Sequence, residues 1–255
     1  MNRVEFVGAM GAGKSSIFET LFKMVRGDSG IFEARHLKKE IFLKEARRTS
    51  SVHHSLLKIL CLSKRLEANL INDKVTASAW KAVAQQAANW KPLIDEALSQ
   101  DHGSVVGCAD QLIRTSWFIR DLTDVALLLE SNYSDITAVH DESLLQRGVG
   151  FGLGETDADD FAERYFRNVP VPDLVVHVDV PDPDLLMHRV RARPRNESRI
   201  IDHLPKAIEL SKTGARIMRD RGVPVSYCDG RDDVKANAMR VLRAVEGRFV
   251  VTTQN

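Results

Sequence analysis

The order of apolar and polar positions along the chain predicts strands separated by helices. Val4, Phe6 and Val7 form a β-favouring run that ends in a glycine loop, and residues 16–25 then place apolar side chains at helical spacing. Residues 31–34 are predicted as a second short strand. Later strands are predicted over 136–140, 174–180 and 224–228, with helices over 184–193, 200–220 and 234–247. This order indicates an α/β fold with a doubly wound, parallel sheet and an active site at the strand carboxyl ends.

Residues 36–131 are predicted to be helical almost throughout. Leucines recur every three to four residues, and a long amphipathic helix is expected from Asp110 to Glu130. Helix breaks are expected near residues 91–92, where Lys91 precedes Pro92, and near 101–103. Neither an internal repeat nor a low-complexity linker sets this segment apart. The whole chain, 1–255, is therefore predicted as one domain with a helical insertion over about 36–131.

Composition and charge are those of an ordinary globular protein. Hydrophobic residues make up 44% and charged residues 28%, and the net charge of +1 gives no global basic field for nucleic acid. The three cysteines are widely spaced, without metal-ligand spacing. The sequence has no apolar run long enough to cross a bilayer, and its first residues predict a strand rather than a signal peptide. A cytoplasmic location is expected.

The strongest motif is Gly8-Ala9-Met10-Gly11-Ala12-Gly13-Lys14-Ser15, which fits G-x-x-x-x-G-K-[ST] without a mismatch. The glycines allow a backbone that aims consecutive N–H groups at phosphates. Lys14 is predicted to bridge the β- and γ-phosphates of ATP, and Ser15 to ligate Mg²⁺. The other predicted nucleotide contacts are Gly8, Gly11, Ala12, Gly13 and Ser16.

An acidic pair, Asp141 and Glu142, follows the strand over 136–140. An acid at this edge of the sheet can hold Mg²⁺ or activate the attacking nucleophile. Asp141 is the predicted metal ligand, both acids are candidate catalytic residues, and which of them is the base stays open. The alternative is that Asp141 caps the following helix.

Arg147 lies where it could reach a phosphate of the acceptor, although a surface arginine is almost equally consistent with the sequence. The glycine-rich residues 148–154 are predicted to form a mobile loop over the acceptor, or an ordinary flexible connection. Arg114, near Trp117 in the helical region, is a further candidate acceptor contact. Tryptophans at helical spacing, however, more often pack in a core.

Arginines cluster after the strand over 174–180. Arg189, Arg193 and Arg195 belong to a predicted lid over about 188–200, which would stabilise the transferring phosphoryl group and exclude water. A solvated basic helix end is the alternative. Asp229 begins the loop after the last strand, where backbone amides are expected to read the adenine edge. Asp232 and Asp233 are predicted to cap the final helix.

Together these motifs resemble the thymidylate kinase and deoxynucleoside kinase branch of P-loop kinases, over about residues 1–26 and 134–247. The resemblance implies a five-stranded parallel sheet, ATP with Mg²⁺ as donor, and a small hydroxyl or phosphate acceptor beneath the helical region. The chain departs from the family at Asp141-Glu142-Ser143, where these kinases usually have Asp-Arg and an aromatic residue, or Glu-Arg-Ser. The acceptor is therefore not carried over.

The leading hypothesis is an ATP-dependent phosphotransferase acting on a nucleoside, a nucleotide or a related hydroxyl compound. The alternative is a P-loop ATPase in which Asp141 and Glu142 activate water; the predicted lid argues against it. The expected partners are ATP and a small-molecule acceptor, with nucleic acid considered only as a modified-base acceptor and no membrane. Whether the chain forms a homodimer is left open.

Overall fold

The computed structural model describes residues 2–25, 29–37, 41, 64–98, 108–131, 136–192 and 201–247. Within this part of the chain, a parallel sheet of five strands has the order β2-β3-β1-β4-β5. The strands are β1 (Asn2–Val7), β2 (Ile31–Glu33), β3 (Thr137–His140), β4 (Leu174–Asp179) and β5 (Val225–Asp229). The α/β fold class is confirmed, including the short second strand.

The first strand of the chain is the central strand of the sheet. β1 pairs with β3 from Asn2↔Thr137 to Glu5↔His140, and with β4 from Val4↔Leu174 to Val7↔His177. Its side chains are buried after Asn2, as expected for a parallel strand covered on both faces. Because all strands run in the same direction, the segments that follow β1, β3 and β4 meet at one edge of the sheet.

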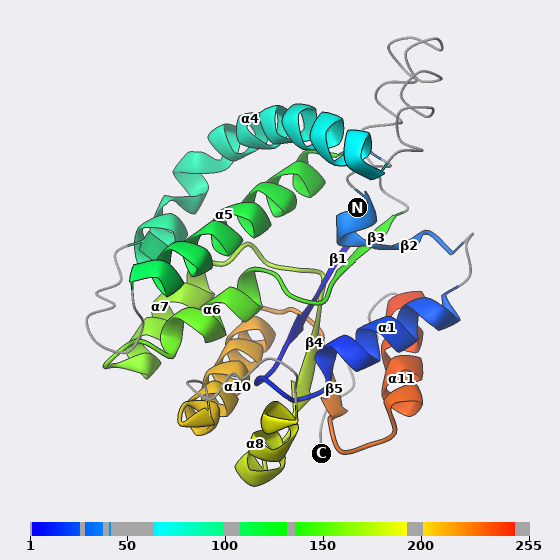
Figure 1. The fold of residues 1–255 in the computed structure, drawn as a ribbon, viewed down its shortest axis with the longest axis vertical. Coiled ribbons are helices and arrows are strands. Elements are labelled where there is room, and N and C mark those ends of the chain that lie inside the picture. The colour runs from blue at the N-terminus through cyan, green and yellow to red at the C-terminus, as the bar shows by residue number, and fades with distance from the viewer. Residues whose placement is uncertain are drawn as a thin grey trace.

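Helices cover both faces of the sheet (Figure 1). On one side, α1 (Lys14–Met24) packs against α11 (Val234–Glu246). On the other side, α6 (Leu144–Gly152), α7 (Ala158–Asn168) and α10 (Leu204–Asp220) pack together, and α8 (Pro183–Arg191) follows β4. α6, α7, α10 and α11 each bury at least four apolar residues and α1 buries three, which is what holds these helices on the sheet or on their neighbours.

Two long helices form a further layer outside α6 and α7. They are α4 (Lys64–Leu98) and α5 (Cys108–Glu130), which pack against each other and contact α7 and α6 respectively. The break predicted at Lys91–Pro92 is wrong, because α4 continues through Pro92. Trp90 and Leu93 on either side are buried, and their packing offsets the cost of about 3 kcal/mol for a proline inside a helix. The break predicted near 101–103 lies outside the described residues.

No helix in the described ranges combines the length and the apolar character needed to cross a membrane.

Candidate functional site

The glycine motif forms a tight turn between β1 and α1. The N–H of Ala12 donates to the carbonyl of Ala9 (3.2 Å), and Gly11 has φ +83° at the third position of this turn. That conformation favours glycine. Gly13, with φ +102°, is the N-cap of α1 and supplies no side-chain cap, so the first amides of the helix keep the arrangement that binds phosphate.

The ammonium group of Lys14 folds back over this loop. Its Nζ donates to the carbonyls of Gly8 (2.8 Å) and Ala9 (3.1 Å), and the residue is buried. The following residues, Ser15 and Ser16, are exposed in the first turn of α1. A buried ammonium, an uncapped helix terminus and an exposed hydroxyl therefore lie in sequence along one loop, which is the donor set that a triphosphate with Mg²⁺ requires.

Two glycines of the site stand where a side chain does not fit. A Cβ on Gly8 would lie 2.4 Å from the carbonyl oxygen of Val178, and one on Gly230 would lie 2.2 Å from that of Ala12. Both neighbours are backbone atoms, which cannot move without shifting their own segments. Gly8 thus permits the glycine motif, residues 8–15, to approach β4; this segment is called the phosphate loop below. Gly230 permits the loop after β5 to lie against the phosphate loop.

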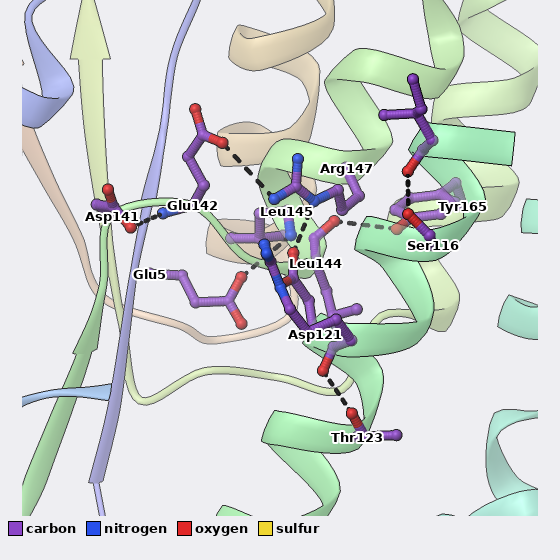
Figure 2. A network of polar contacts seen from close by, with 12 residues as sticks. Glu5, Ser116, Asp121, Thr123, Asp141, Glu142, Leu144, Leu145, Arg147 and Tyr165 are labelled. Carbon is purple, nitrogen blue, oxygen red and sulfur yellow. Dashed lines mark hydrogen bonds and ion pairs between the residues drawn. The ribbon is translucent and has the colours of Figure 1, made fainter. Parts of the chain in front are cut away.

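The acidic pair connects β3 to α6. Oδ1 of Asp141 accepts a hydrogen bond from the N–H of Glu142 (2.8 Å), as Figure 2 shows. The N-cap of α6 is Ser143, which makes no side-chain capping bond; instead, Oε2 of Glu5 in β1 accepts from the N–H of Leu145 (3.1 Å). The alternative that Asp141 caps this helix is therefore wrong.

Glu5 is a buried carboxylate that the sequence analysis missed, because it lies within the first strand. Burial raises its pKa, and the guanidinium of Arg3, 3.2 Å away, opposes that rise. The hydrogen bond from Leu145 also favours the charged form. A carboxylate on β1 thus holds the first turn of α6 at the edge of the sheet.

Three consecutive residues of α6 contact three different parts of the protein. Leu145 contacts Glu5, Oε1 of Gln146 accepts from the N–H of Gly8 (3.3 Å), and Nε of Arg147 donates to Oδ2 of Asp121 on α5 (2.6 Å). The helix after the acidic pair is therefore bonded to the phosphate loop on one side and to α5 on the other. Figure 2 shows the contacts that Leu145 and Arg147 make.

Arg147 is held in an ion pair. Besides Asp121, its guanidinium lies 5.2 Å from the centroid of the Trp117 ring and 3.6 Å from Oε2 of Glu142. The structure thus brings Arg147 beside Glu142, with Asp121 as its partner, and the predicted contact with a phosphate stays a prediction. Asp121 is nearly buried, and the sequence analysis missed it because an acid in a long amphipathic helix ordinarily faces solvent.

The glycine-rich stretch after Arg147 is helical through Gly152, so both loop interpretations of this segment are wrong. A Cβ on Gly148 would lie 2.5 Å from the ring of Tyr165, and one on Gly152 would lie 2.8 Å from Leu210. These glycines let α6 pack closely on α7 and α10. Close helix packing outweighs the low helix propensity of glycine.

A cavity of about 320 Å³ opens beside the acidic pair. It lies between the ends of β2 and β3 and the helix α5, and five of its lining residues are carboxylic acids. Its charged lining residues are Glu33, Arg35, Arg120, Asp121, Asp124, Asp141, Glu142 and Arg147. Glu33 and Asp124 are not predicted from the sequence. Glu33 ends β2, and a position at the end of a strand is the same signal that indicates Asp141.

Arg114 does not belong to this cavity lining. Its Nη1 donates to the carbonyl of Gly150, so it joins α5 to α6. Of the tryptophans in the helical layer, Trp90 is buried in the core, whereas Trp80 and Trp117 are about half exposed. Among these residues, Trp117 alone reaches the site, through Arg147.

The one described member of the three predicted lid arginines contacts backbone. Nη1 of Arg189 donates to the carbonyl of Gly11 (3.4 Å), and Nη2 to that of Gly230 (3.0 Å). Arg193 and Arg195 lie outside the described residues. The lid therefore stays a prediction, while Arg189 itself joins the phosphate loop to the loop after β5.

Asp229 is engaged by its neighbour. Arg231 donates to both carboxylate oxygens of Asp229, at 2.9 Å to Oδ1 and 2.6 Å to Oδ2, and these bonds lower the pKa of Asp229. Asp233, two residues further on, accepts from the N–H of Ala236 (2.9 Å) and caps α11 as predicted. The side chain of Asp229 thus shapes this loop, and its carbonyl accepts from Nδ2 of Asn237 (2.7 Å). The expected contact of this loop with adenine stays a prediction.

The site also suits Mg²⁺. Among the described residues, no group of three or more His, Cys, Asp or Glu side chains could hold a metal by itself. Mg²⁺ in nucleotide enzymes typically takes one or two protein oxygens, with phosphates and water completing its shell. The exposed hydroxyl of Ser15 and the carboxylate of Asp141, at the same edge of the sheet, match that requirement.

The strand order, the glycine loop after β1 and the helix that follows it form the α/β architecture of a P-loop fold. No family model matches the chain, and no curated protein matches it. Solved structures of deoxyadenosine kinase from M. mycoides are similar to it. The one with bound dATP shares 14% identity at a TM-score of 0.41, over 95% of this chain and 98% of that one. The one with products dCMP and dCDP shares 15% at 0.42, over 96% and 99%.

The likeness to these structures is distant in both identity and TM-score.

Proposed function

We propose that the protein is an ATP-dependent phosphotransferase that binds its acceptor in the cavity beside Asp141 and Glu142. The observation that carries this proposal is the position of that cavity. Asp141 directly follows β3, which pairs with β1, and Gln146 bonds the phosphate loop to the helix that begins after the acidic pair. A triphosphate on the loop and an acceptor in the cavity would thus face each other across one sheet edge.

The roles follow from the geometry. The amides at the start of α1 and the ammonium group of Lys14 would hold the β- and γ-phosphates, and Ser15 and Asp141 would hold Mg²⁺. The metal supplies positive charge that offsets the charge on the transferring group. A carboxylate of the cavity would accept the proton of the acceptor hydroxyl; Glu142, Asp141 and Glu33 are the candidates.

The charge of the cavity favours an acceptor without a phosphate group. Five carboxylic acids and three arginines are among its lining residues. Each arginine already contacts a carboxylate: Arg35 contacts Glu33, and Arg120 and Arg147 contact Asp121. A phosphate on the acceptor would therefore meet an excess of like charge. This supports a nucleoside or another uncharged hydroxyl compound over a nucleotide.

We also propose that residues 1–255 form one domain in which the helical region covers the acceptor. In support of this, α5 carries Asp121 and Trp117, which contact Arg147 beside the acidic pair. An ATPase remains the competing activity, because a carboxylate that activates a hydroxyl can also activate water.

The test is a measurement of ADP release. The purified protein is assayed with Mg²⁺ and ATP alone, and then with nucleosides, the corresponding nucleoside monophosphates, sugars and sugar phosphates. We expect little release without acceptor and stimulation by an uncharged hydroxyl compound. Lys14→Ala should abolish release, whereas Lys23→Ala, exposed near the end of the same helix, should not change it.

The outcomes separate the competing functions. Rapid release that no acceptor stimulates would identify an ATPase instead. Faster ADP release with a nucleoside monophosphate or sugar phosphate than with the matching uncharged compound would contradict the charge argument. It would not contradict the proposed transferase activity. A protein without Mg²⁺-dependent affinity for ATP would contradict the whole proposal.

A further inference from the structure

The helix α8 packs directly on the turn of the phosphate loop. A Cβ on Gly11 would lie 3.2 Å from Cγ2 of Val190 and 3.3 Å from the carbonyl oxygen of Leu186. Both residues are buried on the inner face of α8. Arg189, between them in sequence, is thereby brought within hydrogen-bond distance of this turn.

The guanidinium of Arg189 spans two loops. It donates to the carbonyl of Gly11 in the phosphate loop (3.4 Å) and to the carbonyl of Gly230 in the loop between β5 and α11 (3.0 Å). These two loops also touch each other, since Gly230 lies against the carbonyl of Ala12. The N–H of Gly230 donates to the carbonyl of Asp179, which fixes the same peptide segment to β4 (2.8 Å).

Both carbonyls belong to peptides whose N–H groups are also engaged. In a trans peptide the N–H points opposite to the C=O. In the peptide that joins Gly11 to Ala12, the N–H donates to the carbonyl of Ala9. In the peptide that joins Gly230 to Arg231, the N–H donates to Oδ1 of Asp229. A guanidinium that holds the two carbonyls therefore fixes the orientation of two whole peptide groups.

We propose that Arg189 is a positioning residue that clamps the phosphate loop to the loop after β5, and so keeps the phosphate and nucleoside portions of the nucleotide site in register. This inference rests on the proposed function, because it assumes that a nucleotide occupies both loops. It differs from the lid role predicted for Arg189. A lid arginine contacts the γ-phosphate, whereas this guanidinium acts through backbone that a diphosphate would use equally.

The two roles differ in how they depend on the γ-phosphate. Affinities for Mg²⁺·ADP and for the Mg²⁺ complex of a non-hydrolysable ATP analogue are measured by calorimetry for the wild type and for Arg189→Gln. A positioning role predicts that both affinities fall by the same factor, at least about tenfold for the loss of hydrogen bonds to a charged group. A lid role predicts that only the affinity for the triphosphate falls.

The chain offers a matched control in Arg221. Its Nη1 also donates to two backbone carbonyls, those of Phe166 (2.9 Å) and Val169 (2.7 Å), at the segment that leads into the opposite end of β4. Arg221→Gln should lower the melting temperature to a similar extent as Arg189→Gln, and should leave both nucleotide affinities unchanged. A parallel loss of affinity in Arg221→Gln would show that the effect of Arg189 is general destabilisation.

A second variant covers the case in which Arg189→Gln does not fold. Arg189→Lys keeps the positive charge but loses the planar fork, so it should still weaken ADP and the ATP analogue equally. Unchanged affinities, or a loss confined to the triphosphate, would overturn the inference. If the wild type binds neither nucleotide, the proposed function fails instead, and the two failures are distinguished by the wild-type measurement.

Discussion

The guanidinium of Arg147 and the carboxylate of Asp121 meet at 2.6 Å between α6 and α5, with side chains only 10% and 6% exposed. Removing one member of a nearly buried pair leaves the other charge without its partner, which costs about 3 kcal/mol or more. We therefore expect Asp121→Asn to lower the free energy of unfolding by about 3 kcal/mol in urea titrations.

The double variant Asp121→Leu/Arg147→Met should recover much of that stability, because it removes both charges. Glu209→Gln, which removes an exposed partner of Lys212, serves as the control and should cost less than about 1 kcal/mol. A cost for Asp121→Asn as small as that of the control would contradict the assignment of a buried ion pair.

The glycines of α6 give a prediction within one helix. Gly148→Ala would place a Cβ 2.5 Å from the ring of Tyr165, whereas a Cβ on Gly150 meets nothing within 4 Å. We expect Gly148→Ala to destabilise by about 1–3 kcal/mol through overpacking. Gly150→Ala should stabilise by up to about 1 kcal/mol through helix propensity. Thermal unfolding of the two variants measures the difference, and equal effects would show that α6 does not pack as described.

The acid pair should separate into two roles. Asp141→Asn and Glu142→Gln are expected to lower kcat by different factors, because one side chain would serve the metal and the other the proton. The activity of the metal-ligand variant should recover partly at high Mg²⁺ concentration, and the base variant should lose the acid limb of the pH–rate profile. Full activity in both variants would remove this pair from the site.

Below neutral pH, stability should depend on His177. Burial, with smaller contributions from the charges of Lys212 and Lys14, lowers its pKa from 6.5 to about 4. The unfolded chain therefore binds a proton near pH 6.5 that the folded protein does not bind until about pH 4. The contribution to stability is full above pH 6.5 and is lost as the pH falls towards 4, by an amount on the order of 3 kcal/mol.

The comparison of urea unfolding at pH 7 and pH 4.5 measures this loss. His177→Gln should reduce the difference in unfolding free energy between the two pH values, and His188→Gln, on the exposed face of α8, should not. An unchanged pH dependence in His177→Gln would mean that His177 titrates normally.

Local sequence signals were sufficient where one motif or one strand determines the structure. The phosphate loop follows from its own eight residues, and the buried strands follow from short apolar runs such as Leu174–Val178. The predictions were wrong where packing between distant segments determines the local structure. The glycines after Arg147 have low helix propensity, yet Tyr165 and Leu210 require them at a helix contact. Pro92 likewise stays within α4, between buried Trp90 and Leu93.

The candidate site was predicted in part for the same reason. Lys14, Asp141 and Glu142 each follow a strand, so their meeting at one edge could be inferred from strand order. Asp121 and Glu5 could not, because their roles depend on partners about 26 and 140 positions away in the chain. A position inside a helix or strand gives no local sign of such a partner.

The central place of β1 has a consequence for how the chain folds. Asn2 pairs with Thr137 and Val4 with Leu174, so neither neighbour of the first strand comes from nearby sequence. Closing loops of that length costs entropy before any sheet hydrogen bond forms, and topologies dominated by distant contacts fold slowly. The cap that Glu5 provides to α6 likewise joins residues 140 positions apart in the chain. Assembly of the sheet centre, and with it the acceptor side of the cavity, is thus expected to be a late step that leaves apolar strands exposed to aggregation until it is complete.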